Sequence, residues 1–398
     1  MSTLIDAASV EAVKNSADQL GDLLELIIAS GPTTRAELME RTGLSRTTLG
    51  ARLKELVNQR LISEADAGPS TGGRPPTGFL FNAGAGVVLA LDVGVTRSAI
   101  AVVDLAGNAL LERPLPRPIG TDPQAFLDAA ADDLEAILAE SGRTKEQVRA
   151  IGVALPGSVD FDTGRPLSPL LMPGWDDFPV ADTLSERFGA AVLVDNDVNV
   201  IALGEARPGE AVVVVKAGTG IGLGSVFDGL VQRGAQGCAG DVGHIRVPDF
   251  EDIVCRCGKR GCVQAVAGGR SMAQRLREAG IECEGAADIA VLARSGVPEA
   301  ITTVRQAGQA IGFVLAAVVN VLNPSRLVVA GDLTEARDYL LSALREIVYR
   351  ESNPLATSEL EIDRARAGHR AGLIGASTLA LDHALAPTTI ADIARAAA

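Results

Sequence analysis

The sequence predicts an α/β protein, with a small helical domain over residues 1–82 and a larger body over residues 83–398. Three observations support this prediction. Apolar residues recur at helical spacing through residues 18–60, short apolar strands alternate with helices from Val87 onward, and cysteines gather in one loop at residues 237–264. A chain of 398 residues is long enough for two or three domains.

The composition argues against several classes of protein. A net charge of −14 disfavours a protein that coats nucleic acid over its whole surface, and 47% hydrophobic residues are enough for a large core. We find no run of about 18 apolar residues, so we expect no membrane span. The N-terminus lacks the basic start and apolar core of a signal peptide. We therefore expect a soluble, cytoplasmic protein with no membrane partner.

The first two helices of the small domain are bounded by local signals. Residues 18–29 place apolar side chains on one helical face, and Ser30-Gly31-Pro32 should end that helix. Thr34 and Glu37 have the spacing of a capping box, which predicts the start of a second helix. Thr42-Gly43 should form the following turn, because glycine is favoured just past the C-terminus of a helix.

The third helix carries the residues that we expect to contact DNA. Ser45 should cap it, with the helix running from Arg46 to Gln59. Two helices joined by a Gly-containing turn are typical of a helix-turn-helix, whose second helix enters the major groove. Residues 41–60 carry five basic residues against Glu55 alone, which fits a DNA-binding head on an acidic body. The expected DNA-contacting residues of this helix are Arg46, Thr47, Thr48, Gly50 and Lys54.

Two short strands should follow as a wing. Residues 61–64 and 77–81 have strand-like sequences, and a Gly/Pro-rich tip separates them. Within that tip, Gly73-Arg74-Pro75 resembles the core of an AT-hook, which would place Arg74 in a narrow minor groove. A plain Pro-rich linker is the alternative for the tip. An oligomerisation or protein-docking module is the alternative for the helices, although the wing favours DNA binding.

Polar residues follow the ends of predicted strands in the body. Residues 87–92 and 98–104 should form a hairpin, and residues 192–194 form another apolar strand. Asn196 and Asp197 come directly after this last strand, where ligands commonly bind. The alternative is an Asn-Asp turn in which Asp197 caps the next helix. We favour ligand binding because both side chains offer hydrogen-bonding groups at a buried strand end.

The second half of the body mixes strands and helices. Residues 212–216 should form a strand, and the glycine-rich run 218–224 predicts a phosphate-binding turn or simply a tight hairpin. The Ala-rich last dozen residues offer no clear partner. We expect four further helices at residues 270–279, 285–294, 298–322 and 335–350.

One loop contains a predicted zinc site. Gly258 and Gly261 allow the backbone to turn, so that three cysteine sulfurs can converge. Thiolate and imidazole are preferred zinc ligands, and four of them close a tetrahedral structural site. The alternatives are reduced thiols or a disulfide, and a disulfide is disfavoured in a chain without an export signal. We expect one structural Zn²⁺ per chain, bound by His244, Cys255, Cys257 and Cys262.

The same loop resembles the zinc signature of the ROK family, whose sugar kinases and sugar-responsive transcription regulators share one domain. The family pattern Gly-Glu-x-Gly-His appears here as residues 240–244, and Cys-x-Cys-Gly-x-x-Gly-Cys-x-Glu appears as residues 255–264. Asp241 and Gln264 replace the two glutamates of that pattern. The hairpin at residues 87–104 also resembles the ribonuclease-H-like fold of sugar kinases and actin. The resemblance covers about residues 18–385 and implies a two-lobed body.

This resemblance implies roles for several residues. The ROK kinases bind sugar hydroxyls with an Asn-Asp pair whose Asp is the general base, the position of Asp197 here. Their phosphate hairpin has Gly where this chain has Val95, which should crowd an approaching phosphate. Their Gly-Gly beside adenosine is Ala330-Gly331 here. The resemblance implies an effector site formed by Asn196, Asp197, Asp241, His244 and Gln264.

These features predict a DNA-binding transcription regulator of carbohydrate metabolism genes, acting as a repressor, rather than an enzyme. Its partners would be a double-stranded DNA operator, a sugar or sugar derivative, and copies of itself in a homodimer or homotetramer. Because Asp241 and Gln264 depart from the family pattern, the effector is an unusual sugar, a phosphorylated one, or absent. The alternatives are an ATP-dependent ROK sugar kinase with a DNA-binding head, and a zinc-containing scaffold that binds neither ligand.

Overall fold

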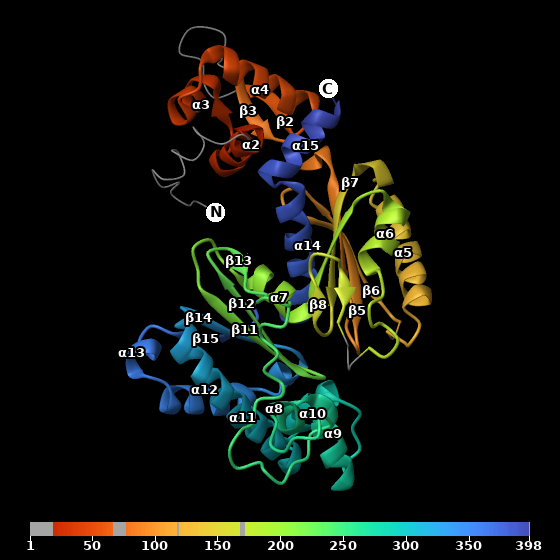
Figure 1. Cartoon of the computed structure of the whole chain (residues 1–398), viewed down its shortest axis with the longest axis vertical. Coiled ribbons are helices and arrows are strands. Elements are labelled where there is room, and N and C mark those ends of the chain that lie inside the picture. The colour runs from red at the N-terminus through yellow and green to blue at the C-terminus, as the bar shows by residue number, and fades with distance from the viewer. Residues whose placement is uncertain (1–18, 67–76, 118, 168–171, 398) are drawn as a thin grey trace.

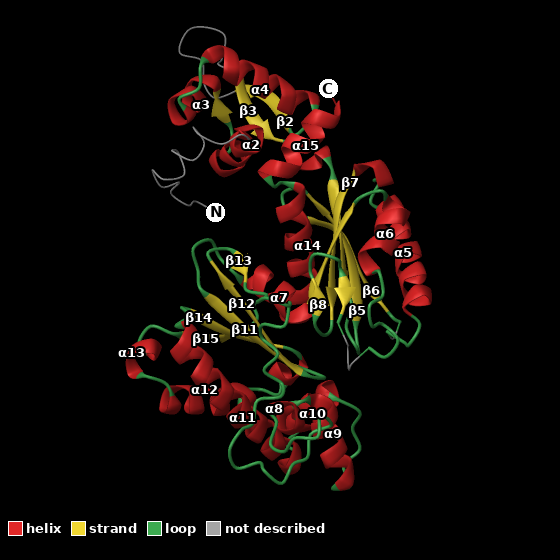
Figure 2. Ribbon diagram, viewed as in Figure 1, coloured by secondary structure: helices red, strands yellow, loops and turns green. Residues whose placement is uncertain are grey.

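The computed structural model describes residues 19–66, 77–117, 119–167 and 172–397. Figure 1 shows a small head at the top and two lobes below it, each built on a five-stranded sheet. Helices flank both sheets (Figure 2), so the predicted α/β class is confirmed. Arg74 and the rest of the proposed AT-hook lie outside the described residues.

The head has the predicted winged helix-turn-helix arrangement. The capping box of Thr34 and Glu37 is formed, and Gly43 ends the second helix with a φ of 66°. A short strand that the sequence did not predict, β1, pairs with β3 to give the sheet order β1-β3-β2. The elements of the head are α2 (Gln19–Ser30), β1 (Thr33–Thr34), α3 (Arg35–Thr42), α4 (Arg46–Asn58), β2 (Ile62–Asp66) and β3 (Thr77–Phe81).

The first lobe contains a sheet of order β10-β7-β4-β5-β6, with helices on both faces. Helices α5 and α6 cover one face, and α7 and α14 contact the other. A separate two-stranded ribbon consists of β8 (Val159–Asp160) and β9 (Arg165–Pro166). The other elements are β4 (Val87–Asp92), β5 (Ser98–Asp104), β6 (Ala109–Leu115), α5 (Pro123–Glu140), β7 (Val148–Leu155), α6 (Val180–Phe188), β10 (Ala191–Asn196), α7 (Asp197–Glu205) and α14 (Ala371–Ala384).

The second lobe contains a sheet of order β13-β12-β11-β14-β15. Its outer face packs on a helical layer, whose core includes residues of α8 to α12. The strands are β11 (Val212–Ala217), β12 (Ile221–Phe227), β13 (Leu230–Val231), β14 (Arg326–Ala330) and β15 (Glu361–Arg364). The helices are α8 (Val263–Ala267), α9 (Gly269–Glu278), α10 (Ala286–Arg294), α11 (Pro298–Leu322), α12 (Tyr339–Glu351) and α13 (Pro354–Thr357).

The two sheets repeat one topology. In each, three antiparallel strands come first, and two strands parallel to the first of them follow. Strands β4 and β11 therefore hold equivalent places, and each leads into a hairpin turn. Helices α7 and α14 lie between the sheets (Figure 1). They pack tightly, because a Cβ on Gly375 would overlap the Val200 carbonyl.

The C-terminal residues have a partner that the sequence did not reveal. Helix α15 (Pro387–Ala397) contacts α2 of the head, far from α15 in sequence (Figure 1). Ile390 is 1% exposed and belongs to the same apolar cluster as Leu23 and Leu24. The expectation of an unpartnered tail was therefore wrong. The contact depends on long-range packing, which an Ala-rich composition does not encode.

One helix qualifies the expectation of no membrane span. Among the described residues, α11 alone is long and apolar enough to cross a bilayer by length and composition. Its most apolar window is 56% buried inside the protein. Ile311, Leu315 and Val319 of α11 belong to the core of the second lobe. A mostly buried helix of this kind is typical of a protein core.

Candidate functional sites

The N-terminal half of α4 presents the predicted DNA-binding face. Arg46, Thr47 and Thr48 are exposed, as is Lys54 two turns later, whereas Gly50 is half-buried. The opposite face of α4 is buried through Leu49, Leu53 and Leu56. The Ser45 hydroxyl accepts a hydrogen bond from the Thr48 amide at 3.2 Å, which confirms the predicted cap. The first residues of α4 are therefore both capped and exposed at the surface of the head.

The predicted zinc ligands converge. The donor atoms of His244, Cys255, Cys257 and Cys262 all lie within 4.8 Å of one another. Cys257 Sγ lies 3.7 Å from Cys262 Sγ, and Cys255 Sγ lies 3.6 Å from His244 Nδ1. Zinc bonds of about 2.3 Å to sulfur and about 2.0 Å to nitrogen give tetrahedral edges of about 3.5–3.8 Å. These four residues therefore fit a tetrahedral zinc ion.

Two glycines bring the cysteines together. Gly258 has a φ of 87° and Gly261 a φ of 69°, values that side chains other than glycine rarely adopt. The turn between them is closed by an antiparallel bridge from Val254 to Arg260. A second bridge joins Arg246 to Cys262 and so connects the histidine side of the loop to the cysteine side. The expected backbone reversal is thus confirmed.

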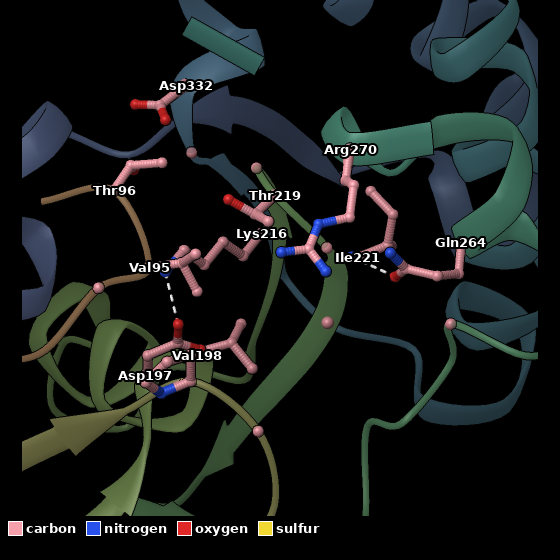
Figure 3. A pocket seen from close by; sticks show the side chains of 18 of the residues that line it. Val95, Thr96, Asp197, Val198, Lys216, Thr219, Ile221, Gln264, Arg270 and Asp332 are labelled. Carbon is pink, nitrogen blue, oxygen red and sulfur yellow. Dashed lines mark hydrogen bonds and ion pairs between the residues drawn. The ribbon is translucent and has the colours of Figure 1, made fainter. Parts of the chain in front are cut away.

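A pocket of about 1800 Å³ lies between the two lobes. Strand ends, hairpin turns and the zinc loop line this pocket, which we call the interlobe pocket. Figure 3 shows side chains from both sheets pointing into it. The residues predicted to bind an effector all line it, namely Asn196, Asp197, Asp241, His244 and Gln264.

Lys216 and Asp197 form an ion pair inside the pocket (Figure 3). Lys216 Nζ lies 2.6 Å from Asp197 Oδ2, and their side chains are 29% and 11% exposed. Burial lowers the pKa of Lys216, but the carboxylates of Asp197, Asp92 and Asp332 outweigh it, so the pKa is raised overall. The ammonium therefore stays charged and occupies one oxygen of Asp197.

Asn196 serves as a helix cap. Its Oδ1 accepts a hydrogen bond from the Val198 amide at 3.0 Å, and its Nδ2 donates to the Gly157 carbonyl at 2.5 Å. The alternative in which Asp197 caps α7 was therefore wrong, because Asn196 does so. These bonds fix the turn from β10 into α7, and that turn directs Asp197 toward Lys216.

Gln264 connects the zinc loop to the glycine-rich turn at residues 218–224. Its Oε1 accepts a hydrogen bond from the Ile221 amide at 2.8 Å (Figure 3). The backbone N–H of Gln264 donates a hydrogen bond to the backbone carbonyl of Gly243 at 2.8 Å, one residue before His244. Asp241 is exposed at the edge of the pocket and His244 is half-buried. The conformation of the zinc loop is thereby coupled to the pocket wall.

Asp92 lies deep in the same pocket. Burial raises its pKa to about 6, although nearby Lys216 lowers it. Gly372, near the start of α14, lies so close that a Cβ there would overlap the Asp92 carboxylate. Val95 and Ala330 also line the pocket.

Three basic residues in the pocket were not singled out from the sequence. Lys216 is the one charged residue of β11, whose sequence is VVVVKA, and a lone lysine in a valine strand could have drawn attention. Arg97 forms an ion pair with Asp332 and so joins the hairpin turn of the first lobe to the second lobe. Arg270 extends its guanidinium into the pocket from the start of α9 (Figure 3).

Known proteins resemble this chain in both its parts. A model of the ROK family matches residues 88–383, and a winged helix-turn-helix DNA-binding model matches residues 18–63. The xylose repressor of Bacillus spizizenii is 27% identical, and the match covers 96% of this chain and 99% of that protein. The glucokinase of Halalkalibacterium halodurans is 30% identical, covering 73% of this chain and 93% of that enzyme.

One solved structure matches the whole architecture. It is that of a ROK family transcriptional regulator described as a homologue of the Escherichia coli MLC protein. The TM-score is 0.79, with 23% sequence identity over 98% of this chain and 99% of that one. At this identity the likeness establishes the fold, including the combination of a winged head with two lobes.

Proposed function

The chain belongs to the ROK family and carries a winged helix-turn-helix head, and from this we propose that it is a DNA-binding transcription regulator of carbohydrate metabolism genes, acting as a repressor. We propose that it works in the cytoplasm as a homodimer or homotetramer, because paired heads match paired half-sites in an operator. The proposal takes residues 1–82 as the DNA-binding part and residues 83–398 as the effector-binding part.

The main support for a DNA-binding function is the exposed start of α4. Arg46 and Thr47 project from a helix whose other face is fixed in the head core, as direct contact with base edges requires. Lys54 lies farther along the helix and suits a phosphate contact, while Thr48 and Gly50 border the same face. Arg52 is half-buried, so it contributes less to the basic surface than the exposed Arg46 and Lys54.

We propose that a sugar or sugar derivative binds in the interlobe pocket. Asp197 and Asp241 offer acceptors for sugar hydroxyls there, and His244, whose Nδ1 would bind the zinc, would offer its other ring nitrogen as a donor. Asn196 and Gln264 already hold the surrounding backbone, so they would contribute their remaining hydrogen-bonding capacity. The structural zinc would keep the loop that carries His244 in place.

A sugar kinase is the second candidate, because Asp197 lies in the pocket at the position of the kinase base and the glucokinase match covers 73% of this chain. Two features count against it. One oxygen of the Asp197 carboxylate, Oδ2, already accepts a hydrogen bond from Lys216. Val95 adds a branched side chain where backbone would have to meet phosphate.

The test combines operator binding with a turnover assay. The full chain should bind its operator, and one sugar or sugar phosphate from a panel should release it. Asp197→Asn should still bind the operator but respond at least tenfold more weakly to that ligand. An ADP-release assay over the same panel should stay silent, and turnover of about 1 s⁻¹ or more would identify a kinase.

A further inference from the structure

Among the residues that the structure describes, Arg270 of the interlobe pocket has a guanidinium without a hydrogen-bond or ion-pair partner. It lies in the first turn of α9 and extends its side chain into the pocket (Figure 3). Two other cations of the pocket are already paired, Lys216 with Asp197 and Arg97 with Asp332. Arginine stays protonated in proteins and has five N–H donors in a planar fork. The donors of Arg270 are therefore available to a ligand.

The glycine-rich turn beside Arg270 has unused backbone donors. The backbone N–H of Arg270 donates to the Thr219 carbonyl at 3.4 Å, and that of Gly269 donates to the Gly218 carbonyl at 2.9 Å. The turn is thereby held against the start of α9. Within the described part of the chain, the N–H groups of Thr219 and Gly220 have no acceptor, and both residues are half-buried and line the pocket. Backbone amides and a guanidinium are groups that bind phosphate oxygens.

The charge next to this turn suits an anion. Gln264 is neutral, and its Oε1 accepts the hydrogen bond from the Ile221 amide, one residue beyond the turn's unpaired donors (Figure 3). A glutamate in its place could accept the same bond but would add a negative charge there. Lys216 and Asp197 compensate each other as an ion pair, so they do not cancel the charge of Arg270.

We propose that Arg270, together with the amides of Thr219 and Gly220, binds a phosphate group of the effector, and that the effector is therefore a phosphorylated sugar. This inference rests on the proposed function and narrows it to one class of ligand. Asp241 and His244 line the same pocket and would bind hydroxyls of the sugar. A pocket of about 1800 Å³ has room for both parts of the molecule. An unphosphorylated sugar would leave the guanidinium without a partner.

Inorganic phosphate tests the anion site without knowledge of the sugar. The full chain should melt at a higher temperature in phosphate than in chloride at equal ionic strength, because a bound ligand stabilises the folded state. Phosphate also stabilises folded proteins in general, so the site is measured by the difference between variants. Arg270→Gln should lose part of the shift, and Arg270→Lys should lose less. Arg305→Gln is the matched control, because Arg305 is an exposed arginine of α11 outside the pocket.

Matched pairs of ligands then identify the class of effector. Hexoses, pentoses and N-acetylated sugars are each compared with their phosphate esters by calorimetry. At least one ester should bind the wild type about tenfold or more tightly than its parent sugar, as hydrogen bonds to a charged group allow. Arg270→Gln should remove that preference. Gln264→Glu keeps an acceptor for the Ile221 amide and should weaken the ester more than the parent sugar. ATP is included as a phosphate source without the sugar's hydroxyl pattern and should not bind.

Four results would overturn the inference. They are an equal phosphate shift in the wild type and Arg270→Gln, a free sugar that binds at least as tightly as its ester, an ester preference that survives Arg270→Gln, and binding of ATP alone. Silence of every sugar and ester would contradict the proposed effector pocket, while the phosphate comparison still decides the anion site. Failure of the wild type to bind any operator would contradict the regulatory function and leave both ligand results standing.

Discussion

Gly21 of the head lies directly against Pro387, the first residue of the last helix, so that a Cβ on Gly21 would overlap the proline backbone. The two residues are separated by almost the whole chain. Through this contact α15 packs on α2, and Ile390 enters the apolar cluster that includes Leu23 and Leu24.

Gly21→Ala should therefore destabilise the protein. Alanine favours a helix over glycine by about 1 kcal/mol, so a variant without this contact would be stabilised. Overlap with Pro387 should reverse the sign and cost about 1–3 kcal/mol. Thermal unfolding measures the change. Gly285→Ala is the control, since a Cβ there meets nothing within 4 Å and φ is −167°. A higher melting temperature for Gly21→Ala would show that the contact is not formed.

Purified protein should contain about one zinc ion per chain. Cys257→Ser should lose the metal and, through the Gln264 link to Ile221, weaken effector binding more than operator binding. Elemental analysis and ligand titration measure both effects. Cys238→Ser is the matched control for zinc content, because Cys238 is also exposed but lies outside the cluster. Full zinc content in Cys257→Ser would contradict the proposed ligand set.

Arg46→Ala and Thr47→Ala should each weaken binding to the specific operator by about 1–3 kcal/mol, because they would contact bases. Lys54→Ala should weaken binding to all sequences and reduce the salt slope by about one. Arg305→Ala, an exposed arginine on α11, should change neither. Fluorescence anisotropy at several salt concentrations separates the outcomes. Equal operator binding by a protein lacking residues 1–82 would rule out the head as the DNA-binding part.

Asp92 should make stability depend on pH. Because burial raises its pKa to about 6, its contribution to stability is present at low pH and is lost as pH rises through 6. The Asn side chain of Asp92→Asn cannot ionise. The unfolding free energy of this variant minus that of the wild type should therefore increase by roughly 1–3 kcal/mol between pH 4 and pH 7. The attraction to Lys216 acts only on the ionised carboxylate and is already contained in that pKa. A gap that stays constant across that range would contradict the raised pKa.

Local signals made much of the head predictable. The capping box of Thr34 and Glu37, the glycine at position 43 and the cap at Ser45 each act over about one helical turn, and all are formed. The zinc ligands were equally predictable from the sequence, because Cys255, Cys257 and Cys262 lie close in sequence and glycines bend the chain between them.

Contacts between distant segments were not predictable in the same way. Strand β1 is only two residues long and exists because it pairs with β3. The partner of Lys216 depends on how two lobes approach each other, and nothing in VVVVKA specifies Asp197. For the same reason, the sequence could not show that Asn196 rather than Asp197 would cap α7.

The packing of α15 on the head changes how the head is attached. Two backbone connections join it to the lobes, one through residues 82–86 before β4 and one through residues 385–386 after α14. A domain attached at two points rotates most easily about the line that joins the two attachments. The second connection leads back along α14 to Gly372, beside Asp92 in the pocket. A tilt of α14 would therefore rotate the DNA-binding face of α4 about a single axis. A head attached by one connection would instead be free to rotate in all directions.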